Sequence, residues 1–394
     1  FLFKVFLTLG LIILLYFKIK LYHTQSYNNE LHYDLDVYAQ LQHLKNEMHN
    51  KNAARRMQSY YPEGFVFQNA LYGLTWCDLL NNQTDLGVRT EALEEIDWAI
   101  AELCSEDGIL YFQKDLPIPY GIFYQGWTNI LIGKRLQIEN DSSLLTTFLS
   151  YCDTLNSAYT QGNSPYLESY ENAIWPADNI IGLAALNLGN TFSTGRYDQT
   201  INLWLNNIKS NLDKSGRIPH SVSANGRTSQ LSRGNSMSLM LCFLKDLDMT
   251  FAQEQFESYK SAYVTTRLGL PGIREHAKGI DKSGDIDSGP VIWDIGGAAS
   301  IVGQRTMAIY EEWNTAEGLR NSIESFGVAY TANGQKKYVF GQVPMADAFI
   351  AWSNASTTER DMQPTTNWRW KFQLGSIVLA IILLLTFIKS HHYH

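Results

Sequence analysis

Apolar residues recur at helical spacing in segments that alternate between short polar connections and long connections rich in glycine and proline. The short connections are 81–85, 139–141, 190–194 and 246–248, and the long ones are 105–119, 161–171, 214–232, 269–287 and 327–342. If consecutive helices run antiparallel, every second connection lies on the same face. The long loops then gather at one rim, where we expect a functional site.

The same periodicity predicts twelve helices, which pair into six helical hairpins. The predicted helices are 23–50, 67–80, 88–104, 120–137, 142–159, 173–188, 197–212, 229–244, 250–267, 289–308, 311–325 and 343–355. Strand-like alternation is confined to the short segments 110–113 and 337–340.

Alternate helices differ in composition. Those that follow a long loop are rich in small residues, as in 173–188 and 289–308, whereas those that follow a short break are ordinary amphipathic helices, as in 91–103. Small residues let helix backbones approach closely on several sides, as buried helices require. An inner and an outer set of six helices indicate an all-α protein with an (α/α)6 toroid. The alternative is an open α-solenoid, although no motif recurs at a fixed period.

Both ends of the chain are membrane-like. Val5–Phe17 is almost wholly apolar, and Phe372–Ile388 would cover roughly 25 Å of a hydrocarbon core about 30 Å thick. Trp368 and Trp370 beside basic residues are typical of an interfacial belt. We expect transmembrane helices at 1–22 and 372–388, a linking helix at 23–59, a toroid domain at 60–356 and a linker at 357–371. A signal peptide is the alternative for the first segment, but no A-x-A-like site follows it.

The expected location is the inner or plasma membrane, with the bilayer as a partner. The basic residues that flank the predicted spans on the domain side weakly favour a cytoplasmic domain. The aromatic, hydrogen-bonding loops and the low basic content favour an extracytoplasmic domain, which we expect. The sequence leaves open whether other membrane-complex subunits bind to it.

Composition restricts the function classes. The net charge of −8 and the lack of a basic stripe predict that nucleic acid is not a partner. Cys77, Cys104, Cys152 and Cys242 have no metal-ligand spacing and lie in apolar helical stretches, so we expect buried free thiols. The sequence contains no HExxH motif, no Walker loop and no GxGxxG before a helix, so we expect neither a metal nor a cofactor.

The segment 171–179 is the sharpest chemical signal. Pro176 suits the first turn of a helix, and Asp178 would then lie where the helix dipole favours its ionised form. Glu171 precedes the helix between Tyr170 and Trp175, which could desolvate it and raise its pKa. A raised-pKa acid beside an ionised carboxylate is the pair that glycosidic cleavage needs. The alternative is that Asp178 only caps the helix and that Glu171 is a solvated loop charge.

Asp287, in the segment 285–290, is the second carboxylate signal. It would be either a third catalytic carboxylate at the rim or, with Ser288, a plain helix cap. Arg233 could hold an anionic substrate group through its guanidinium fork or pair with an aspartate at the rim. The residues expected to bind substrate at the rim are Tyr61, Glu63, Tyr124, Trp127, Trp175, His220, Arg233 and Trp293.

Several of these motifs together resemble one superfamily. The hairpin rhythm, Trp-Pro-Ala-Asp-Asn at 175–179, Arg-Gly-Asn-Ser at 233–236, Asp-Ser-Gly-Pro at 287–290 and the segment 344–352 are similar to the (α/α)6 superfamily of six-hairpin glycosidases and linalool dehydratase/isomerase-like proteins. The resemblance covers roughly residues 60–355. It implies inverting hydrolysis, or an allied reaction, by the carboxylates Glu171, Asp178 and Asp287. Linalool dehydratase/isomerase is expected to use a cysteine pair, and the corresponding segment 168–180 has no cysteine.

Three functions follow as hypotheses. The first is a membrane-anchored, glycan-active hydrolase with Glu171 as general acid and Asp178 or Asp287 as base. The second is a dehydratase, isomerase or lyase that acts on a lipid-like alcohol near the bilayer. The third is a non-catalytic subunit that serves as a docking platform in a membrane complex.

Overall fold

The computed structural model describes residues 2–24, 27–28, 33–80, 85–162, 164–356 and 369–392. Helices dominate this part of the chain, which confirms the predicted all-α class. The long helices are α1 (Leu2–Lys20), α2 (Leu35–Lys51), α4 (Gly64–Leu80), α5 (Leu86–Leu103), α7 (Gly121–Ile138), α8 (Ser142–Gln161), α9 (Pro176–Ser193), α10 (Asp198–Ser210), α11 (Gly234–Leu247), α12 (Met249–Tyr263), α13 (Gly297–Ile309), α14 (Trp313–Phe326), α15 (Pro344–Asn354) and α16 (Arg369–His392). The short ones are α3 (Ala53–Gln58), α6 (Glu106–Ile109), η1 (Ile286–Ser288) and η2 (Val339–Gly341).

The strands form antiparallel pairs inside the connections between helices. The pairs are β1 (Tyr27–Asn28) with β2 (Tyr33–Asp34), β3 (Ser221–Val222) with β4 (Thr228–Gln230), β5 (Val264–Arg267) with β6 (Leu270–Ile273), β7 (Val291–Ile292) with β8 (Ile295–Gly296), and β9 (Tyr330–Ala332) with β10 (Gln335–Lys337). The predicted strand at 110–113 is wrong, because these residues form a turn after α6. The helix predicted over 289–308 begins only at Gly297, since β7 and β8 occupy its first part.

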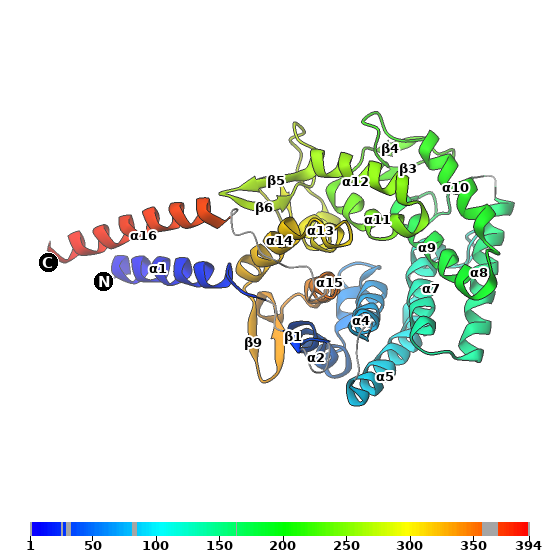
Figure 1. Cartoon of the computed structure of the whole chain (residues 1–394), viewed down its shortest axis with the longest axis horizontal. Coiled ribbons are helices and arrows are strands. Elements are labelled where there is room, and N and C mark those ends of the chain that lie inside the picture. The colour runs from blue at the N-terminus through cyan, green and yellow to red at the C-terminus, as the bar shows by residue number, and fades with distance from the viewer. Residues whose placement is uncertain are drawn as a thin grey trace.

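Six helices pack against one another in turn, and all of them except α4 follow long loops. Helix α4 contacts α7, α7 contacts α9, α9 contacts α11, α11 contacts α13, α13 contacts α15, and α15 contacts α4 again. We call these six the inner helices. The helices α2, α5, α8, α10, α12 and α14 pack on their outer side, as Figure 1 shows. The small residues of the inner helices serve this close approach: a Cβ added at Gly73 would lie 2.7 Å from Leu131 Cδ1 on the neighbouring helix.

Aromatic rings fill the space between the inner helices. The Phe67 ring on α4 lies 4.9 Å from Phe123, 5.4 Å from Trp127 and 5.2 Å from Phe349, so it joins α4 to α7 and α15. Trp127 in turn packs edge-on against Phe243 and Trp352. This aromatic plug comprises Phe67, Phe123, Trp127, Phe243, Phe349 and Trp352. Buried rings of this size dominate the apolar area removed from water on folding.

Helix α16 projects from the helical body beside α1, and both chain ends lie at the far end of the pair (Figure 1). Within the described residues, one helix is long and apolar enough to cross a membrane: α16, over the 21 residues Arg369–Lys389. The prediction of a second membrane span over residues 1–22 is therefore wrong. Helix α1 carries Lys4, Lys18 and Lys20, and its uninterrupted apolar run covers only about 20 Å.

The boundaries of the predicted linker also change. Residues 357–368, including Trp368, lie outside the described residues, and 369–371 already belong to α16. The predicted linking helix at 23–59 divides into the β1–β2 pair, α2 and α3. The four cysteines are free thiols, and Cys77 and Cys152 are buried as expected, but Cys104 is exposed and Cys242 only half-buried.

Candidate active site

Three carboxylates from distant parts of the chain lie close together at the amino-terminal ends of inner helices. Glu63 directly precedes α4, Asp178 is the third residue of α9, and Asp287 lies in η1 before α13. Their charges act on one another: Glu63 and Asp287 both raise the pKa of Asp178, and Glu63 raises the pKa of Asp287. Segments more than 100 residues apart thus contribute to one cluster of carboxylates.

Asp178 is the buried member of this cluster. Its side chain is only 9% exposed, and Ser169 donates a hydrogen bond of 2.6 Å to its Oδ2. Burial, followed by the charges of Glu63 and Asp287, raises the pKa of Asp178 to about 7. The expectation that the helix dipole keeps Asp178 ionised is therefore wrong, because desolvation outweighs the dipole and the Ser169 bond. Near neutral pH this carboxyl holds a proton that it can donate.

Glu63 is held by a phenol. The Tyr170 hydroxyl donates a hydrogen bond of 2.6 Å to Glu63 Oε1. Burial, and next the charge of Glu63, raises the pKa of Tyr170, so the phenol stays a proton donor. Tyr61 faces the same charges, since burial and then Glu63 and Asp287 raise its pKa. Glu63 thus meets at least one neutral hydrogen-bond donor.

Asp287 is held beside the cluster by a hydrogen-bonded network that supports η1. Asp285, not Asp287, caps η1: its side chain accepts from the Asp287 backbone N–H at 3.2 Å and forms a capping box with Ser288. The cap prediction for Asp287 is thus replaced by a cap two residues earlier, which leaves the Asp287 carboxylate exposed to solvent. Desolvation by the surrounding protein, and next the charge of Asp285, raises the pKa of Asp287.

Arg233 is the centre of that support. Its Nη1 and Nη2 donate to the two carboxylate oxygens of Asp285 at 2.5 and 2.6 Å, and its Nε donates to Glu275 Oε1 at 2.8 Å. Nη2 also donates to Ser288 Oγ at 2.8 Å. The guanidinium is only 6% exposed, so it is already used inside the protein. Of the two roles predicted for Arg233, pairing with an aspartate is confirmed, and binding of an anionic substrate group is replaced by support of η1.

His220 belongs to the same support. Its Nδ1 is hydrogen-bonded to Ser236 Oγ, and Arg233 Nη1 donates to its Nε2 at 3.3 Å. Burial, and next the positive charge of Arg233, lowers the pKa of His220 to about 4. The imidazole is neutral at physiological pH and lies 6% exposed against the scaffold, so a direct contact with substrate is not supported.

Glu171 lies apart from this chemistry. Its side chain is exposed, although it follows Tyr170 directly in the chain. The desolvation expected from Tyr170 and Trp175 is therefore absent at Glu171. The segment does contain one carboxyl with a raised pKa and one solvated carboxylate, but the two residues have exchanged the expected roles. Asp178 is the buried carboxyl and Glu171 is the exposed one.

The predicted aromatic platforms fall into two groups. Trp127 is fully buried in the aromatic plug, and Tyr124 is 6% exposed and donates to the Leu103 carbonyl at 3.0 Å. Neither ring can stack on a substrate at the rim, and both predictions are corrected. Trp175 is half-buried beside Tyr170, with ring centroids 6.3 Å apart, and so remains next to the carboxylates.

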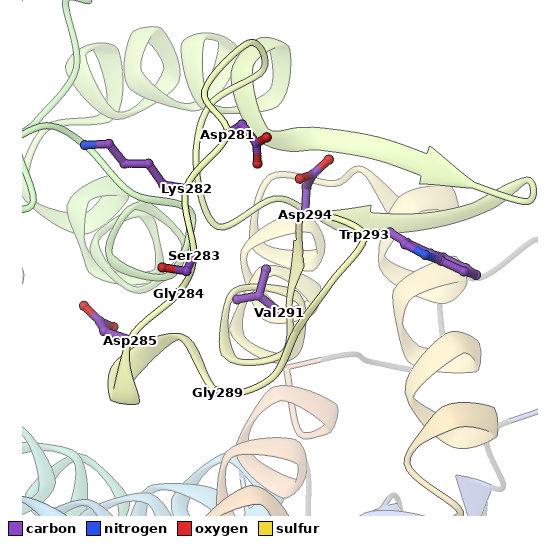
Figure 2. Close-up of a pocket in the computed structure, with 9 residues that line it drawn as sticks. All are labelled: Asp281, Lys282, Ser283, Gly284, Asp285, Gly289, Val291, Trp293 and Asp294. Atoms are coloured by element: carbon purple, nitrogen blue, oxygen red, sulfur yellow. The ribbon is translucent and has the colours of Figure 1, made fainter.

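Trp293 lies on the turn between β7 and β8. It helps to line a recess of about 530 Å³ formed by the 281–294 loop, together with Asp281 and Asp294. Figure 2 shows the indole of Trp293 pointing away from Asp285 and from the other labelled side chains. The lining residues of this recess do not include Glu63, Asp178 or Asp287. Stacking of Trp293 on a substrate held by these carboxylates is therefore not supported.

Gly121 sets the position of Ser169, the partner of Asp178. Gly121 has φ +77°, and a Cβ there would lie 2.2 Å from the Ser169 carbonyl oxygen. We expect Gly121→Ala to lower the free energy of unfolding by about 1–2 kcal/mol for the left-handed backbone and by about 1–3 kcal/mol more for the clash. Gly216→Ala is the matched control, since Gly216 has φ +75° with nothing within 4 Å. Thermal unfolding of both variants should show the larger loss for Gly121→Ala; equal losses would contradict the close approach.

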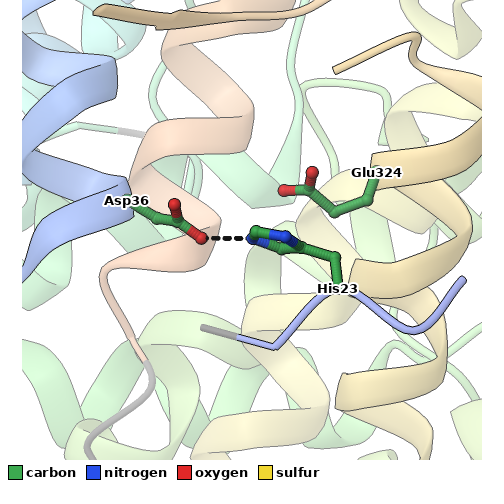
Figure 3. A group of neighbouring side chains, drawn as sticks. All are labelled: His23, Asp36 and Glu324. Atoms are coloured by element: carbon green, nitrogen blue, oxygen red, sulfur yellow. Dashed lines mark hydrogen bonds and ion pairs between the residues drawn. The ribbon is translucent and has the colours of Figure 1, made fainter. Parts of the chain in front are cut away.

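A second cluster of ionisable groups lies where α1 and α2 meet α14. His23 Nε2 is 2.5 Å from Asp36 Oδ2, and Glu324 lies beside them, as Figure 3 shows. These donors are close enough together to hold a metal ion. The Lys336 ammonium already lies among them, 2.5 Å from Glu324 and 3.2 Å from Asp36. A cation of the protein itself thus neutralises the two carboxylates.

The residues that sequence reasoning missed at the site are those that hold the carboxylates. Ser169 carries no motif, and its role depends on a backbone contact with the start of α7. Tyr170 was visible as one of several rim tyrosines, but its bond to Glu63 joins residues 107 positions apart. Asp285 was identifiable as an acidic residue two positions before Asp287.

Comparison with protein-family models finds none that matches the chain. Comparison with curated proteins finds no significant relative. Function therefore has to be argued from the site itself.

Proposed function

We propose that this protein is a membrane-anchored enzyme that cleaves a C–O bond in a glycan by acid–base catalysis. The observation that carries the proposal is Asp178: a buried carboxyl with a pKa raised to about 7, beside two further carboxylates. Pairs of titratable groups whose environments separate their pKa values identify acid and base roles. Glu171, Asp178 and Asp287 were the sequence candidates, and only the last two have this environment.

The proposed fold is an (α/α)6 toroid like that of the six-hairpin glycosidases. Its support is the cyclic order of contacts among the inner helices, five of which follow a long connection. The carboxylates at the amino-terminal ends of α4 and α9 and in η1 before α13 would then lie in the mouth of the toroid. Fold likeness alone does not set the reaction, so the roles rest on the individual side chains.

In the proposed reaction, protonated Asp178 donates its proton to the glycosidic oxygen as the C–O bond to the anomeric carbon breaks. Asp287 or Glu63, as carboxylate, accepts a proton from a water molecule whose oxygen attacks that carbon. The products are a sugar hemiacetal and a free alcohol, and the two carboxyl groups exchange their protonation states. Solvent exposure of Asp287 gives water a route to the base. Trp175, Tyr61 and Tyr170 supply rings and neutral hydroxyl groups around the sugar.

A second candidate function shares the first half of this reaction. Protonation of an alcohol oxygen by Asp178, followed by loss of a proton from the neighbouring carbon, would dehydrate a lipid-like alcohol. The apolar aromatic plug and the membrane-spanning length of α16 favour this alternative. The glycan reaction is preferred because an exposed carboxylate at the cluster can activate water.

For location, we propose that α16 spans an inner or plasma membrane and that the helical body lies on the extracytoplasmic side. The length of α16 and its exposed leucine and isoleucine side chains support a span. The net charge of −8 suits a body that does not bind an anionic cytoplasmic leaflet electrostatically.

The experiment is turnover of the purified full chain on a panel of chromogenic glycosides and cell-surface glycans. Asp287→Asn and Glu63→Gln are compared with Glu171→Gln as the matched control, because Glu171 is exposed and outside the cluster. We expect one of the first two variants to lose about 10²–10⁴ in turnover and Glu171→Gln to retain the wild-type rate. Equal rates in all three variants would remove the assignment. A product that contains no oxygen from labelled water would favour dehydration instead.

A further inference from the structure

Large apolar side chains are exposed on the part of the body from which α16 projects. They come from the β5–β6 turn, the β7–β8 hairpin, the end of α14 and the start of β9. Their exposed fractions are 62% for Leu268, 63% for Ile292, 65% for Trp293, 53% for Phe326 and 54% for Tyr330. We call these five residues the basal face. A surface of this kind marks an interaction site when it is contiguous.

The contacts around α16 make the basal face continuous with the membrane helix. Leu270, which follows the β5–β6 turn, packs in one buried cluster with Leu21 and with Phe372 of α16. Figure 1 shows the β5–β6 hairpin reaching toward the first turn of α16. Arg267 Nε donates to the Trp293 backbone carbonyl at 3.2 Å, so the backbone of the β7–β8 turn is tied to the β5–β6 hairpin. Leu268 and Trp293 therefore lie near the first turn of α16.

Helix α1 fixes the other half of the face. The Phe326 ring lies 4.9 Å from the Phe17 ring, and Tyr16 donates to the Ala329 carbonyl at 3.3 Å. Phe326 and Tyr330 are thus held beside the last turns of α1, where Lys18 and Lys20 begin to interrupt its apolar sequence. Because α1 packs beside α16, and Leu21 packs with Phe372, these turns lie near the start of α16, where that helix would pass from headgroups to hydrocarbon.

The chemistry of the surrounding residues matches that level. Trp370 and Tyr22, at the adjoining ends of α16 and α1, are 57% and 50% exposed. The Lys371 ammonium lies 5.6 Å from the Trp370 ring, and the Arg369 guanidinium 4.8 Å from the Tyr22 ring. Tryptophan and tyrosine beside lysine and arginine are the residues enriched at the bilayer interface.

We propose that the basal face seats in the interfacial region of the same phospholipid bilayer that α16 enters. The body is then held against the membrane by its own hairpins and not merely tethered by one helix. Burial of Trp293, Trp370 and the exposed aliphatic and aromatic side chains of the basal face in the interface supplies the attraction, and the exposed Lys371 ammonium faces the lipid phosphates. The inference rests on α16 as a span and is independent of the catalytic roles.

The test is fluorescence quenching of the full chain reconstituted in phosphatidylcholine–phosphatidylglycerol vesicles that contain lipids brominated near the headgroup end of the acyl chain. The chain has ten tryptophans, so each indole is measured as a difference between wild type and one variant. Trp293→Phe reports the basal face, Trp370→Phe reports entry of α16, and Trp175→Phe is the matched control at the rim. Circular dichroism checks that each variant folds.

We expect Trp293→Phe and Trp370→Phe to remove lipid-quenched, blue-shifted emission and Trp175→Phe to remove none. Leu268→Trp should add a lipid-quenched component, which supplies a second readout if Trp293→Phe folds poorly. A Trp293 signal quenched by aqueous iodide and not by brominated lipid would overturn the proposal. Protection from both quenchers would also overturn it and would indicate a protein partner. Loss of lipid quenching at Trp370 as well would show that α16 itself is outside the bilayer.

Discussion

Replacing Lys336 by methionine is expected to lower the free energy of unfolding by about 3–5 kcal/mol, the cost of removing one partner from a buried ion pair. Lys336 is 1% exposed, and its ammonium lies 2.5 Å from Glu324 and 3.2 Å from Asp36. Methionine keeps most of the side-chain volume, so the loss is electrostatic: two buried carboxylates remain without their cation.

The pH dependence of the stability loss in Lys336→Met identifies its electrostatic cause. Burial alone would raise the pKa of Glu324 and of Asp36, but Lys336, with His23, holds both below their usual values. Groups with a lowered folded-state pKa add stability above their unfolded pKa, and this stability is lost as the pH falls. Without Lys336, both carboxyls lose a charge that lowers their pKa and protonate more easily, Glu324 above all because Lys336 is its largest pKa-lowering partner. The deficit of Lys336→Met should therefore be largest near pH 8 and should shrink as the pH falls toward 5.

Lys337→Met is the matched control, since the neighbouring lysine loses the same atoms and charge from a half-exposed position. Thermal unfolding in detergent at several pH values measures both variants. We expect Lys337→Met to unfold within a few degrees of the wild type at every pH. Similar melting temperatures for the two variants, or a deficit in Lys336→Met that does not change with pH, would contradict the ion-pair account. Because the cluster joins α2 to α14 and β10, Lys336→Met should still unfold in one cooperative transition, at a lower temperature than the wild type.

Much of the helical framework could be predicted because it depends on local periodicity. The segments 88–104 and 142–159 differ from α5 and α8 by at most two residues at either end. The error at 289–308 has a local cause as well. Residues 291–296 are apolar enough to continue a helix, but Trp293 and Asp294 adopt left-handed backbone angles that form the β7–β8 turn. Pro290 was the one signal in the sequence for this interruption.

The site was harder to predict because burial is a tertiary property. The residue types in 171–179 were right for a carboxylate pair, but which of them loses water depends on Ser169 and on the packing at the start of α7. Arg233 shows the same limit, since its partners Glu275 and Asp285 lie 42 and 52 positions away. The prediction of a second span is wrong for a different reason: the apolar run between Lys4 and Lys18 of α1 is short, and its flanking lysines do not make up the missing length.

Asp178→Asn is expected to stabilise the protein at pH 8 and to abolish acid catalysis. The pKa of Asp178 is raised from 3.8 to about 7, so the folded state binds this proton more tightly than the unfolded state does. Stability therefore falls as the pH rises from about 4 to about 7, and the cost of the buried charge is fully present above pH 7. Asparagine carries no charge and still accepts the Ser169 hydrogen bond. The gain should reach up to about 4 kcal/mol at pH 8 and vanish near pH 4.

Asp198→Asn is the matched control, because Asp198 also lies in the first turn of a helix but is exposed. Losing its charge there should cost a few tenths of a kcal/mol through the helix dipole, at any pH above its own titration. In turnover, wild-type activity should decline as the pH rises above about 7, because Asp178 must be protonated to act, and Asp178→Asn should lose about 10²–10⁴. A variant that is both more stable at pH 8 and inactive would show that the buried carboxyl is kept for chemistry at the expense of stability. An active Asp178→Asn variant would leave Asp178 with no catalytic role. A stability gain that is equal at pH 4 and pH 8 would contradict the raised pKa of Asp178.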